Sequence, residues 1–434
     1  MLCLPPLTSV RRRAYVCPVL SGKFPYYTVE PPTTSIHQTP GTPSLLRAIN
    51  ERTVLELIRV EGALSRAQVA RQSGLSKPTV SQALAGLEES GLVREVGRST
   101  GRKGPGALLY ELNPRSGLVV GLDVGRNWVR GAIADIAGHV VCRRQERTAR
   151  TAAALVEQVA GLGRLLAGDA DLKWRAVTHT TVGIPGALDP VLGTVELAPN
   201  LPRWTSRGLL EAIRHQLGDA VSFENDVNLA ALGEQAAGCA VGVQNFVFLS
   251  VGTGVGLGIV IEGRLYRGAR GAAGEIGYMP LGAGDPHDRA TRRRGALEEA
   301  TSASGVVSLA RELGMPPPLT PKRVFDAARR NDPLAARVVQ AEANRIAMAI
   351  AAVAPVLDPE LVILGGGIGG GGGDLLVDRT LAELTDLSPF RPRIEVSVLG
   401  DEVVLQGALS TALAVAREQV FNRSPDQERR EIMV

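Results

Sequence analysis

The spacing of apolar residues along this chain changes near Ser116. Before that residue, apolar side chains recur every three or four positions, which is typical of short amphipathic helices. After it, apolar runs of four to eight residues alternate with longer helical patterns, which is typical of an α/β protein. Residues 1–43 contain many prolines and little periodicity, so we expect a disordered extension there and a disordered tail at 421–434.

Residues 44–115 carry the pattern of three helices followed by a β-hairpin. Ser65 and Ser76 are suited to begin the second and third helices, because a serine side chain accepts hydrogen bonds from the first free backbone N–H groups. Gly74 ends the second helix, and Pro78 lies in the first turn of the third, where its missing N–H costs little. The expected helices are 44–60, 65–73 and 76–90, and the expected strands are 92–96 and 107–112.

Positive charge is concentrated at this N-terminal end. Residues 45–115 hold 11 basic and 7 acidic residues, whereas the whole chain has a net charge of +4, so an anionic partner is expected here. Short polar side chains on the third helix can reach base edges, and a basic hairpin loop can reach phosphates. The unit resembles the winged helix-turn-helix of bacterial transcription regulators over residues 45–112, although a plain protein-interaction module is the alternative. The predicted contacts to double-stranded DNA are Lys77, Thr79, Ser81, Gln82, Arg98, Arg102 and Lys103.

Two carboxylates follow predicted strands in the α/β part. Asp123 comes after the apolar run 118–122, and Asp226 comes after the run 220–223. An α/β fold places reactive carboxylates at the ends of its sheet, where one could accept a proton and the other could orient a metal or a phosphate. An aspartate in this position can instead be a simple helix cap.

Glycine-rich stretches follow two further predicted strands. The run 246–251 leads into glycines at 252, 254, 256 and 258, and then into a second apolar run, 259–261. The run 361–364 leads into the glycine-rich stretch 365–373. Such glycines let a backbone approach a ligand closely and present N–H groups to an anion. A tight turn for the first stretch and a flexible loop for the second are the structural alternatives.

The cysteines and the hydropathy pattern limit the class of protein. The four cysteines, at 3, 17, 142 and 239, form no C-x-x-C pair, so neither a disulfide framework nor a zinc knuckle is indicated. No apolar run approaches the roughly 20 residues that span a bilayer. We therefore expect a reduced, cytoplasmic setting without membrane contact.

Taken in order, these motifs resemble the ROK family, whose members are repressors and sugar kinases of the actin-like ATPase fold. The resemblance runs from about 116 to 417 and rests on the glycine stretch 252–258 with its tail 271–278, on 224–234, and on 199–201. It implies a two-lobed actin-like (RNase H-like) domain over 116–420, with one lobe at 116–240 plus 404–420 and the other at 241–403. Joined to a winged helix at 44–115, the chain resembles the family's repressor branch of xylose and N-acetylglucosamine regulators.

The same resemblance implies roles for individual residues. In the family's kinases the residue at Asp226 is the base that deprotonates the acceptor hydroxyl, and the residue at Asp123 lies in the first phosphate loop. The implied sugar contacts are Asn200, Asn225, Asp226, Glu275, Tyr278 and Glu298. The implied nucleotide contacts are Asp123, Gly125, Gly252, Thr253, Gly254 and Gly366.

The chain departs from the family pattern in three places. The kinases' D-x-G-G-T loop is changed, because Arg126 and Asn127 replace its second glycine and its threonine. Tyr278 replaces the family's zinc-binding histidine, and 279–299 contains no cysteine, so soft thiolate ligands are missing. Arginines at 289 and 292–294 occupy the former metal loop, where they are solvated or bind a sugar phosphate, and His287 is expected on the surface. We expect neither zinc nor ATP as a cofactor.

Three functions are consistent with the sequence. The favoured one is a dimer, or a dimer of dimers, that represses carbohydrate-metabolism genes and responds to a sugar or a sugar phosphate. The second is an ATP-dependent sugar kinase or a bifunctional kinase-regulator. The third is a DNA-binding protein whose C-terminal part serves only for dimerisation or for docking another protein.

Overall fold

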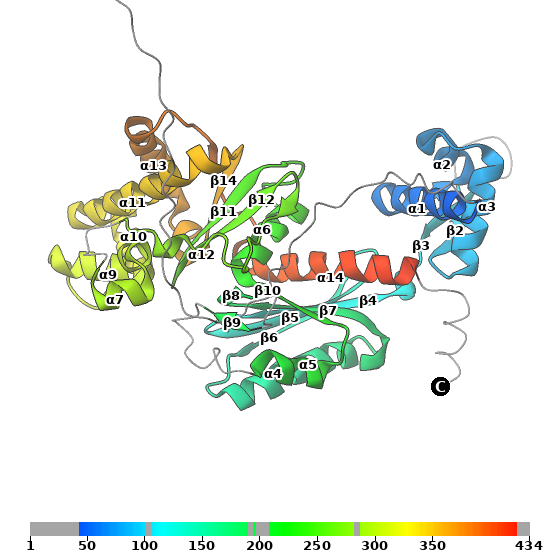
Figure 1. The fold of residues 1–434 in the computed structure, drawn as a ribbon, viewed down its shortest axis with the longest axis horizontal. Helices are drawn as coiled ribbons and strands as arrows, with labels where there is room; N and C mark the ends of the chain where they lie inside the picture. The colour runs from blue at the N-terminus through cyan, green and yellow to red at the C-terminus, as the bar shows by residue number, and fades with distance from the viewer. Residues whose placement is uncertain (1–42, 100–105, 190–193, 197–207, 282–286, 423–434) are drawn as a thin grey trace, which may run out of the picture. The chain divides into compact units, whose positions relative to one another are not determined.

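The computed structural model describes residues 43–99, 106–189, 194–196, 208–281 and 287–422 (Figure 1). The predicted contacts Arg102, Lys103 and Asn200 lie outside these residues, as do 1–42 and 423–434 of the predicted disordered termini. Disorder was wrongly predicted for Pro43, which begins α1 (Pro43–Glu61), and for Phe421, which ends α14 (Val403–Phe421). The described residues from Ala48 onward group into one compact unit.

The N-terminal part is a winged helix, as predicted. Its helices are α1 (Pro43–Glu61), α2 (Arg66–Ser73) and α3 (Lys77–Glu89), and its sheet has the order β1-β3-β2 with β1 (Leu64–Ser65), β3 (Leu108–Leu112) and β2 (Val93–Arg98). The two-residue strand β1 was not predicted from the sequence. It pairs antiparallel with β3.

The predicted helix caps are present. The Ser65 hydroxyl accepts from the Gln68 N–H while the Gln68 side chain accepts from the Ser65 N–H, which is a capping box. Ser76 accepts from the Thr79 N–H at 3.3 Å. Gly74 has a φ of 72°, a left-handed conformation that glycine adopts without a Cβ clash, so it turns the chain between α2 and α3.

The first lobe is built on a five-stranded sheet with the order β10-β7-β4-β5-β6. Helices α4 (Ala152–Asp169) and α5 (Leu209–Leu217) cover one face and α14 (Val403–Phe421) covers the other (Figure 1). Strand β4 is parallel to β7 and antiparallel to β5. The strands are β4 (Leu118–Val124), β5 (Trp128–Asp135), β6 (Val140–Arg147), β7 (Val177–Ile184) and β10 (Val221–Asn225), with β8 (Ala187–Leu188) and β9 (Val195–Glu196) paired beside them.

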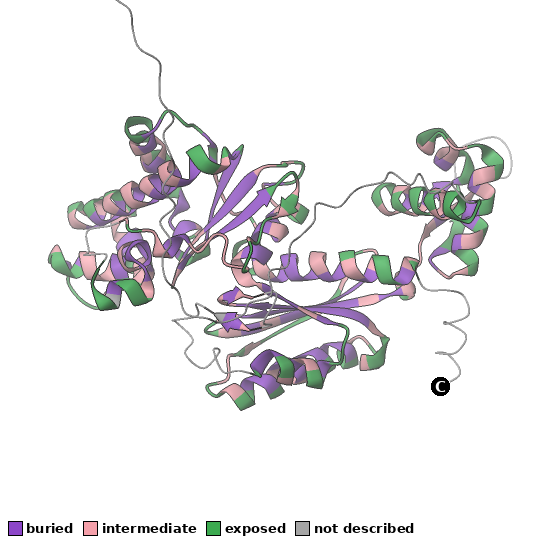
Figure 2. Cartoon of the chain, viewed as in Figure 1, coloured by how far each residue is buried: buried purple, intermediate pink, exposed green. Residues whose placement is uncertain are grey.

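The second lobe has a sheet with the order β13-β12-β11-β14-β15 and the long helix α11 in its core. Its strands are β11 (Phe246–Val251), β12 (Val255–Ile261), β13 (Arg264–Leu265), β14 (Leu361–Gly365) and β15 (Arg393–Val396). Its helices are α7 (Arg289–Arg294), α8 (Ala296–Thr301), α9 (Ala303–Glu312), α10 (Pro321–Arg329), α11 (Pro333–Leu357), α12 (Gly366–Gly369) and α13 (Gly373–Leu387). The central strands β11, β12 and β14 are almost wholly buried, whereas the edge strands β13 and β15 are partly exposed (Figure 2).

The two glycine stretches differ from the expectation. Gly256 and Gly258 lie inside β12, because α6 (Asp226–Ala237) packs directly on that strand: a Cβ on Gly258 would come within 2.7 Å of Ala231. Residues 366–369 and 373–387 are helical rather than a flexible loop. A Cβ on Gly372 or on Gly373 would meet a side chain from elsewhere in the lobe inside 3.0 Å, so tertiary packing fixes this backbone.

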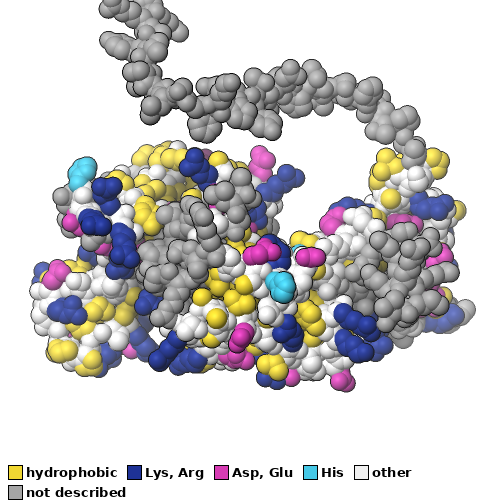
Figure 3. Space-filling view, turned by 60° about the horizontal axis from the view of Figure 1, so that its bottom comes forward, with side chains coloured by type: hydrophobic (Ala, Val, Ile, Leu, Met, Phe, Trp, Pro, Cys, Tyr) yellow, Lys and Arg dark blue, Asp and Glu magenta, His cyan; other side chains and the backbone are white. Residues whose placement is uncertain are grey.

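Charged and apolar side chains are mixed on the visible surface. Basic and acidic side chains both occur over the face drawn in Figure 3, with apolar side chains between them. Among the described residues, no helix combines the length and the apolar character needed to cross a bilayer.

Candidate functional site

A cavity of about 820 Å³ is lined by residues of both lobes. The first lobe contributes Asp123 near the end of β4 and Asn225 at the end of β10. The second contributes the turn 252–254 between β11 and β12, together with Glu275 and Glu298. The volume is within the range of small-molecule sites.

Asn225 is held rigidly at the start of α6. Its Oδ1 accepts from the N–H groups of Val227 (2.9 Å) and Asn228 (3.0 Å), which caps the helix. Its Nδ2 donates to the carbonyl of Gly186 at 3.1 Å. The second hydrogen on Nδ2 is the part of this amide that a ligand can use.

Asp226 and Glu275 are acids kept partly protonated near neutral pH. Burial, followed by the charge of Asp123, raises the pKa of Asp226 to about 7. Burial, followed by the charges of Asp226 and Glu298, raises the pKa of Glu275 to about 7. Carboxyl groups in this state can both donate and accept hydrogen bonds, which suits a ligand with adjacent hydroxyl groups.

Glu298 connects the acidic side of the cavity to the glycine turn. It lies on α8, its side chain is about one-tenth exposed, and its Oε2 accepts from the Val255 N–H at 3.2 Å. Arg294 approaches its other oxygen to 4.0 Å. Glu298 therefore faces the cavity with one oxygen fixed by the first residue of β12.

The opposite end of the cavity carries an ion cluster. Arg130 on β5 pairs with Asp123 at 3.2 Å and with Asp401 at 3.4 Å, and Arg126 lines the same space. Burial raises the pKa of Asp123 to about 6, although Arg130 opposes that effect. Because a guanidinium already neutralises this carboxylate, the residues present do not fit a site at Asp123 for a phosphate-bound magnesium ion.

Most of the predicted cavity residues are brought together. Nine of them line the cavity: Asp123, Asn225, Asp226, Gly252, Thr253, Gly254, Glu275, Glu298 and Gly366. Gly125 and Tyr278 are not among the lining residues, and the Tyr278 hydroxyl donates to the carbonyl of Arg293 at 3.5 Å. A sugar contact by Tyr278 therefore stays a prediction without support from its placement. Arg130 and Asp401 were missed, since no motif marks a lone charge on a strand or in a turn.

The absence of zinc from the region that corresponds to the family's metal loop stays a prediction, because 282–286 lie outside the described residues. Among the described residues, no three His, Cys, Asp or Glu side chains lie together as metal ligands. Protein hydrogen bonds hold the segment instead: the Thr291 hydroxyl donates to Glu299 at 2.9 Å, and the Gly295 N–H donates to the Thr291 carbonyl at 2.7 Å.

The winged helix places its predicted DNA contacts unequally. Lys77 and Gln82 are exposed on α3, whereas Thr79 and Ser81 are half-buried, and the Thr79 hydroxyl bonds that of Ser76 at 2.8 Å. Arg98 is exposed and donates to the carbonyl of Gly106 at 3.0 Å, at the base of the hairpin.

Arg66, a basic residue of the winged helix, was not among the residues singled out from the sequence. Arg66 begins α2, stacks over the Tyr110 ring at 5.2 Å and bonds its hydroxyl. Nothing local in the sequence links Arg66 to a tyrosine 44 residues away.

Known proteins match both parts of the chain. The model of the ROK family matches residues 119–415, and that of the MarR family matches 49–103. The xylose repressor of Caldicellulosiruptor bescii is 27% identical over 400 residues, which cover 86% of this chain and 98% of the relative. The glucokinase of Halalkalibacterium halodurans is 32% identical over 276 residues, 59% of this chain and 82% of the relative. A crystal structure of a ROK family transcriptional regulator, a homologue of the E. coli MLC protein, superposes with a TM-score of 0.70 at 23% identity, covering 87% of this chain and all of that one. These matches confirm the predicted fold class.

Proposed function

This chain belongs to the ROK family, and from that premise we propose that it is a DNA-binding repressor whose two-lobed domain binds a sugar or a sugar phosphate. One observation carries the proposal. The same chain holds a winged helix with exposed Lys77 and Arg98 and a cavity in which Asn225, Asp226 and Glu275 converge. The similarity to a xylose repressor over 98% of that relative supports it.

The cavity chemistry suits a polyhydroxylated ligand. Asp226 and Glu275 come from different lobes and face the same space as Glu298. A sugar presents neighbouring hydroxyl groups that donate and accept, and it can satisfy several such carboxyl groups at once. Arg126 and Arg130 at the other end would donate hydrogen bonds to the phosphate of a sugar phosphate.

Helix α14 offers a route from the cavity to the winged helix. Its first residues, Val403 and Val404, line the cavity, and 19 residues of helix extend about 28 Å at 1.5 Å per residue. Near its other end, Glu418 pairs with Arg52 of α1, and the Arg52 guanidinium lies 5.8 Å from the centre of the Phe421 ring. A shift of α14 on ligand binding would therefore reach α1.

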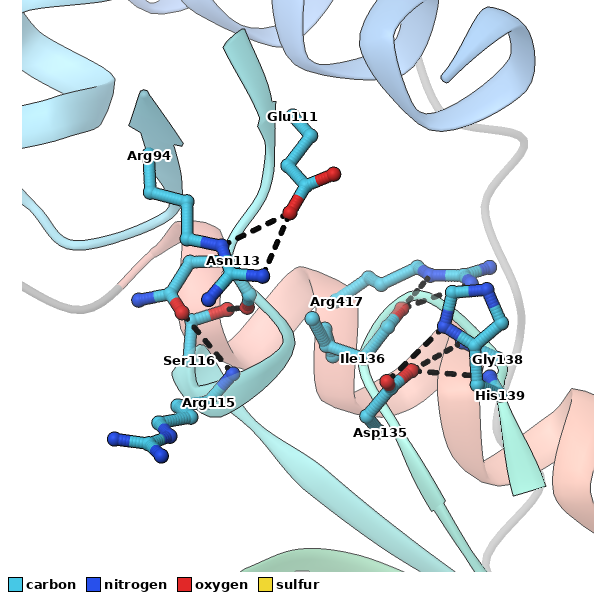
Figure 4. Close-up of polar contacts among 10 residues, drawn as sticks. All are labelled: Arg94, Glu111, Asn113, Arg115, Ser116, Asp135, Ile136, Gly138, His139 and Arg417. Carbon is cyan, nitrogen blue, oxygen red and sulfur yellow. Dashed lines mark hydrogen bonds and ion pairs between the residues drawn. The ribbon is translucent and has the colours of Figure 1, made fainter. Parts of the chain in front are cut away.

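The C-terminal part of α14 is also fixed to the first sheet. Arg417 donates two hydrogen bonds, of 3.1 and 3.0 Å, to the carbonyl of Ile136, which follows β5 (Figure 4). Ser116 and Asn113, between the winged helix and β4, bond each other in the same region (Figure 4). We infer that sugar binding changes operator affinity by shifting a balance between two arrangements of these contacts.

A sugar kinase is the second candidate, and one observation favours it. Asp226 has a pKa near 7, as a general base for a hydroxyl group requires. The pairing of Arg130 with Asp123 weighs against it. A coupled phosphorylation assay with ATP and a panel of hexoses decides: turnover that Asp226→Asn abolishes would establish the kinase.

The repressor proposal is tested by selecting genomic fragments with the purified full chain. We expect a palindromic site with half-sites about one DNA turn apart, as a dimer requires. Release of that DNA by glucose, xylose, N-acetylglucosamine or their phosphates would support the proposal. Selection of no common sequence would refute it.

A further inference from the structure

An ion pair joins the two lobes beside the cavity. Glu224, in β10, directly precedes Asn225 and Asp226, and its side chain is 8% exposed. Its Oε1 accepts from the Asn225 N–H at 3.0 Å and from Asn228 Nδ2 at 2.9 Å. Its Oε2 accepts from Nε of Arg267 at 2.7 Å. Each of these three hydrogen bonds is therefore made either at the start of α6 or with the other lobe.

Arg267 begins the segment that carries Glu275. Its carbonyl accepts from the Ala273 N–H at 3.1 Å, so the segment folds back on itself. The carbonyl of Gly274 then accepts from the Leu257 N–H at 2.9 Å, which ties the segment to β12. Gly274 has a φ of 91°, and a Cβ there would overlap the Leu257 carbonyl. The segment is thus fixed by Arg267 at one end and pressed against β12 just before Glu275.

The two acids at either side of this arrangement repel each other when they are charged. Asp226 belongs to α6 and Glu275 to the segment after Arg267, and the charge of Asp226 is among the causes that raise the pKa of Glu275. That repulsion favours a wider separation of the two carboxyl groups. The attraction between Arg267 and Glu224 opposes this separation. Glu224 directly precedes Asn225 and lies two residues before Asp226.

We propose that Arg267 is a positioning residue of the cavity, which through Glu224 sets the separation of Asp226 and Glu275 and so the affinity for a hydroxyl-rich ligand. The identity of that ligand rests on the proposed function, whereas the ordering of the segment does not. Arg267 need not touch the ligand. Its guanidinium holds the loop of one lobe against the strand end of the other.

The experiment compares the full-length wild type with five variants. Arg267→Met removes the charge and keeps much of the side-chain length, Glu224→Gln keeps the shape of the partner, and a third variant combines both. Arg267→Lys is the conservative variant. Arg264→Met is the matched control, because Arg264 is exposed on β13, three residues earlier.

Two measurements are made on each protein. Hydrogen exchange of the amides at 268–278 reports on the segment without any ligand, and calorimetric titration with glucose, xylose, N-acetylglucosamine and glucose 6-phosphate reports on affinity. We expect faster exchange at 268–278 in Arg267→Met and Glu224→Gln, and an affinity loss of about tenfold for whichever sugar the wild type binds. The double variant should lose no more than the worse single one, Arg267→Lys should recover part of the loss, and Arg264→Met should match the wild type.

The outcomes distinguish the positioning role of Arg267 from the proposed binding of a sugar. Wild-type exchange rates at 268–278 in Arg267→Met would overturn the positioning role, whatever the ligand is. Faster exchange with an unchanged sugar affinity would also overturn it, since the ordering would then not serve binding. Faster exchange in a protein whose wild type binds none of the four probes would support the ordering and count against the proposed function instead.

Discussion

Replacing Asp226 by asparagine should stabilise the fold at alkaline pH while weakening sugar binding. Desolvation of the Asp226 carboxyl, followed by the nearby charge of Asp123, raises the pKa of Asp226 from 3.8 to about 7. In the unfolded chain the proton leaves near pH 4, whereas in the folded protein it is held up to about pH 7. The stability contributed by the bound proton is therefore complete below about pH 4 and is lost as the pH rises through 7. Asparagine carries no proton to lose.

The size of the effect follows from the two pKa values. Their difference is about 3, and each unit corresponds to about 1.36 kcal/mol, so full expression would reach about 4 kcal/mol above pH 7. The cavity is open to water, which screens the charge, and we halve that limit to about 2 kcal/mol at pH 8. At pH 5 the same calculation gives a stabilisation by Asp226→Asn of about 1 kcal/mol.

Urea unfolding at pH 5 and pH 8 measures both values. Asp386→Asn is the matched control, since Asp386 is exposed on α13 and its replacement should leave the free energy of unfolding unchanged at both pH values. Calorimetry on the same samples should show weaker sugar binding by Asp226→Asn, because a stabilising substitution at a binding site trades affinity for stability. An equal effect of Asp226→Asn at pH 5 and pH 8, or a net destabilisation at pH 8, would refute the reasoning.

Three further outcomes are expected. Gly233→Ala should lower the free energy of unfolding by about 2 kcal/mol, because the added Cβ would overlap a backbone oxygen at the start of α14. Gly161→Ala on α4 should raise it by about 0.5–1 kcal/mol, because a Cβ there meets nothing within 4 Å. Thermal unfolding of both variants measures these changes. Lys77→Ala and Arg98→Ala should each weaken operator binding and flatten its salt dependence in gel-shift titrations, while Arg311→Ala on α9 should not. EDTA should leave the melting temperature unchanged, and a clear drop would contradict the prediction that the chain binds no structural metal.

Local patterns were enough to predict most of the fold. Ser65 and Ser76 marked the starts of α2 and α3 because capping depends on neighbouring residues alone. The apolar runs before Asp123 and Asp226 marked β4 and β10, and both carboxylates line one cavity, although Asp123 lies within β4 rather than after it. The family resemblance then placed Glu275 and Glu298 in the same site, although they are far apart in sequence.

The glycine stretches show where local patterns fail. The sequence around Gly258 indicates a loop, yet Gly258 lies in β12. A glycine is needed at this position because Ala231 on α6 leaves no room for a side chain. Gly372 reads as flexible, yet it is pressed against the ring of Phe325. In both cases the partner is more than 20 residues away, so no window of sequence contains the cause.

The ion pairs were beyond sequence reasoning for a similar reason. Arg130 joins Asp123 to Asp401, a residue about 270 positions later, and Arg267 joins Glu224 across the two lobes. A single arginine on a strand or in a turn carries no periodic signal. Only the pairing of strands and lobes shows which carboxylate it meets.

In the proposed function, one chain couples sugar binding in the cavity to operator binding by the winged helix. The most direct test measures operator affinity by fluorescence anisotropy with and without the sugar that binds, and sugar affinity by calorimetry with and without the operator. Because coupling between two sites is reciprocal, the sugar should weaken operator binding by the same factor by which the operator weakens sugar binding. An operator affinity that stays the same at saturating sugar would contradict the account.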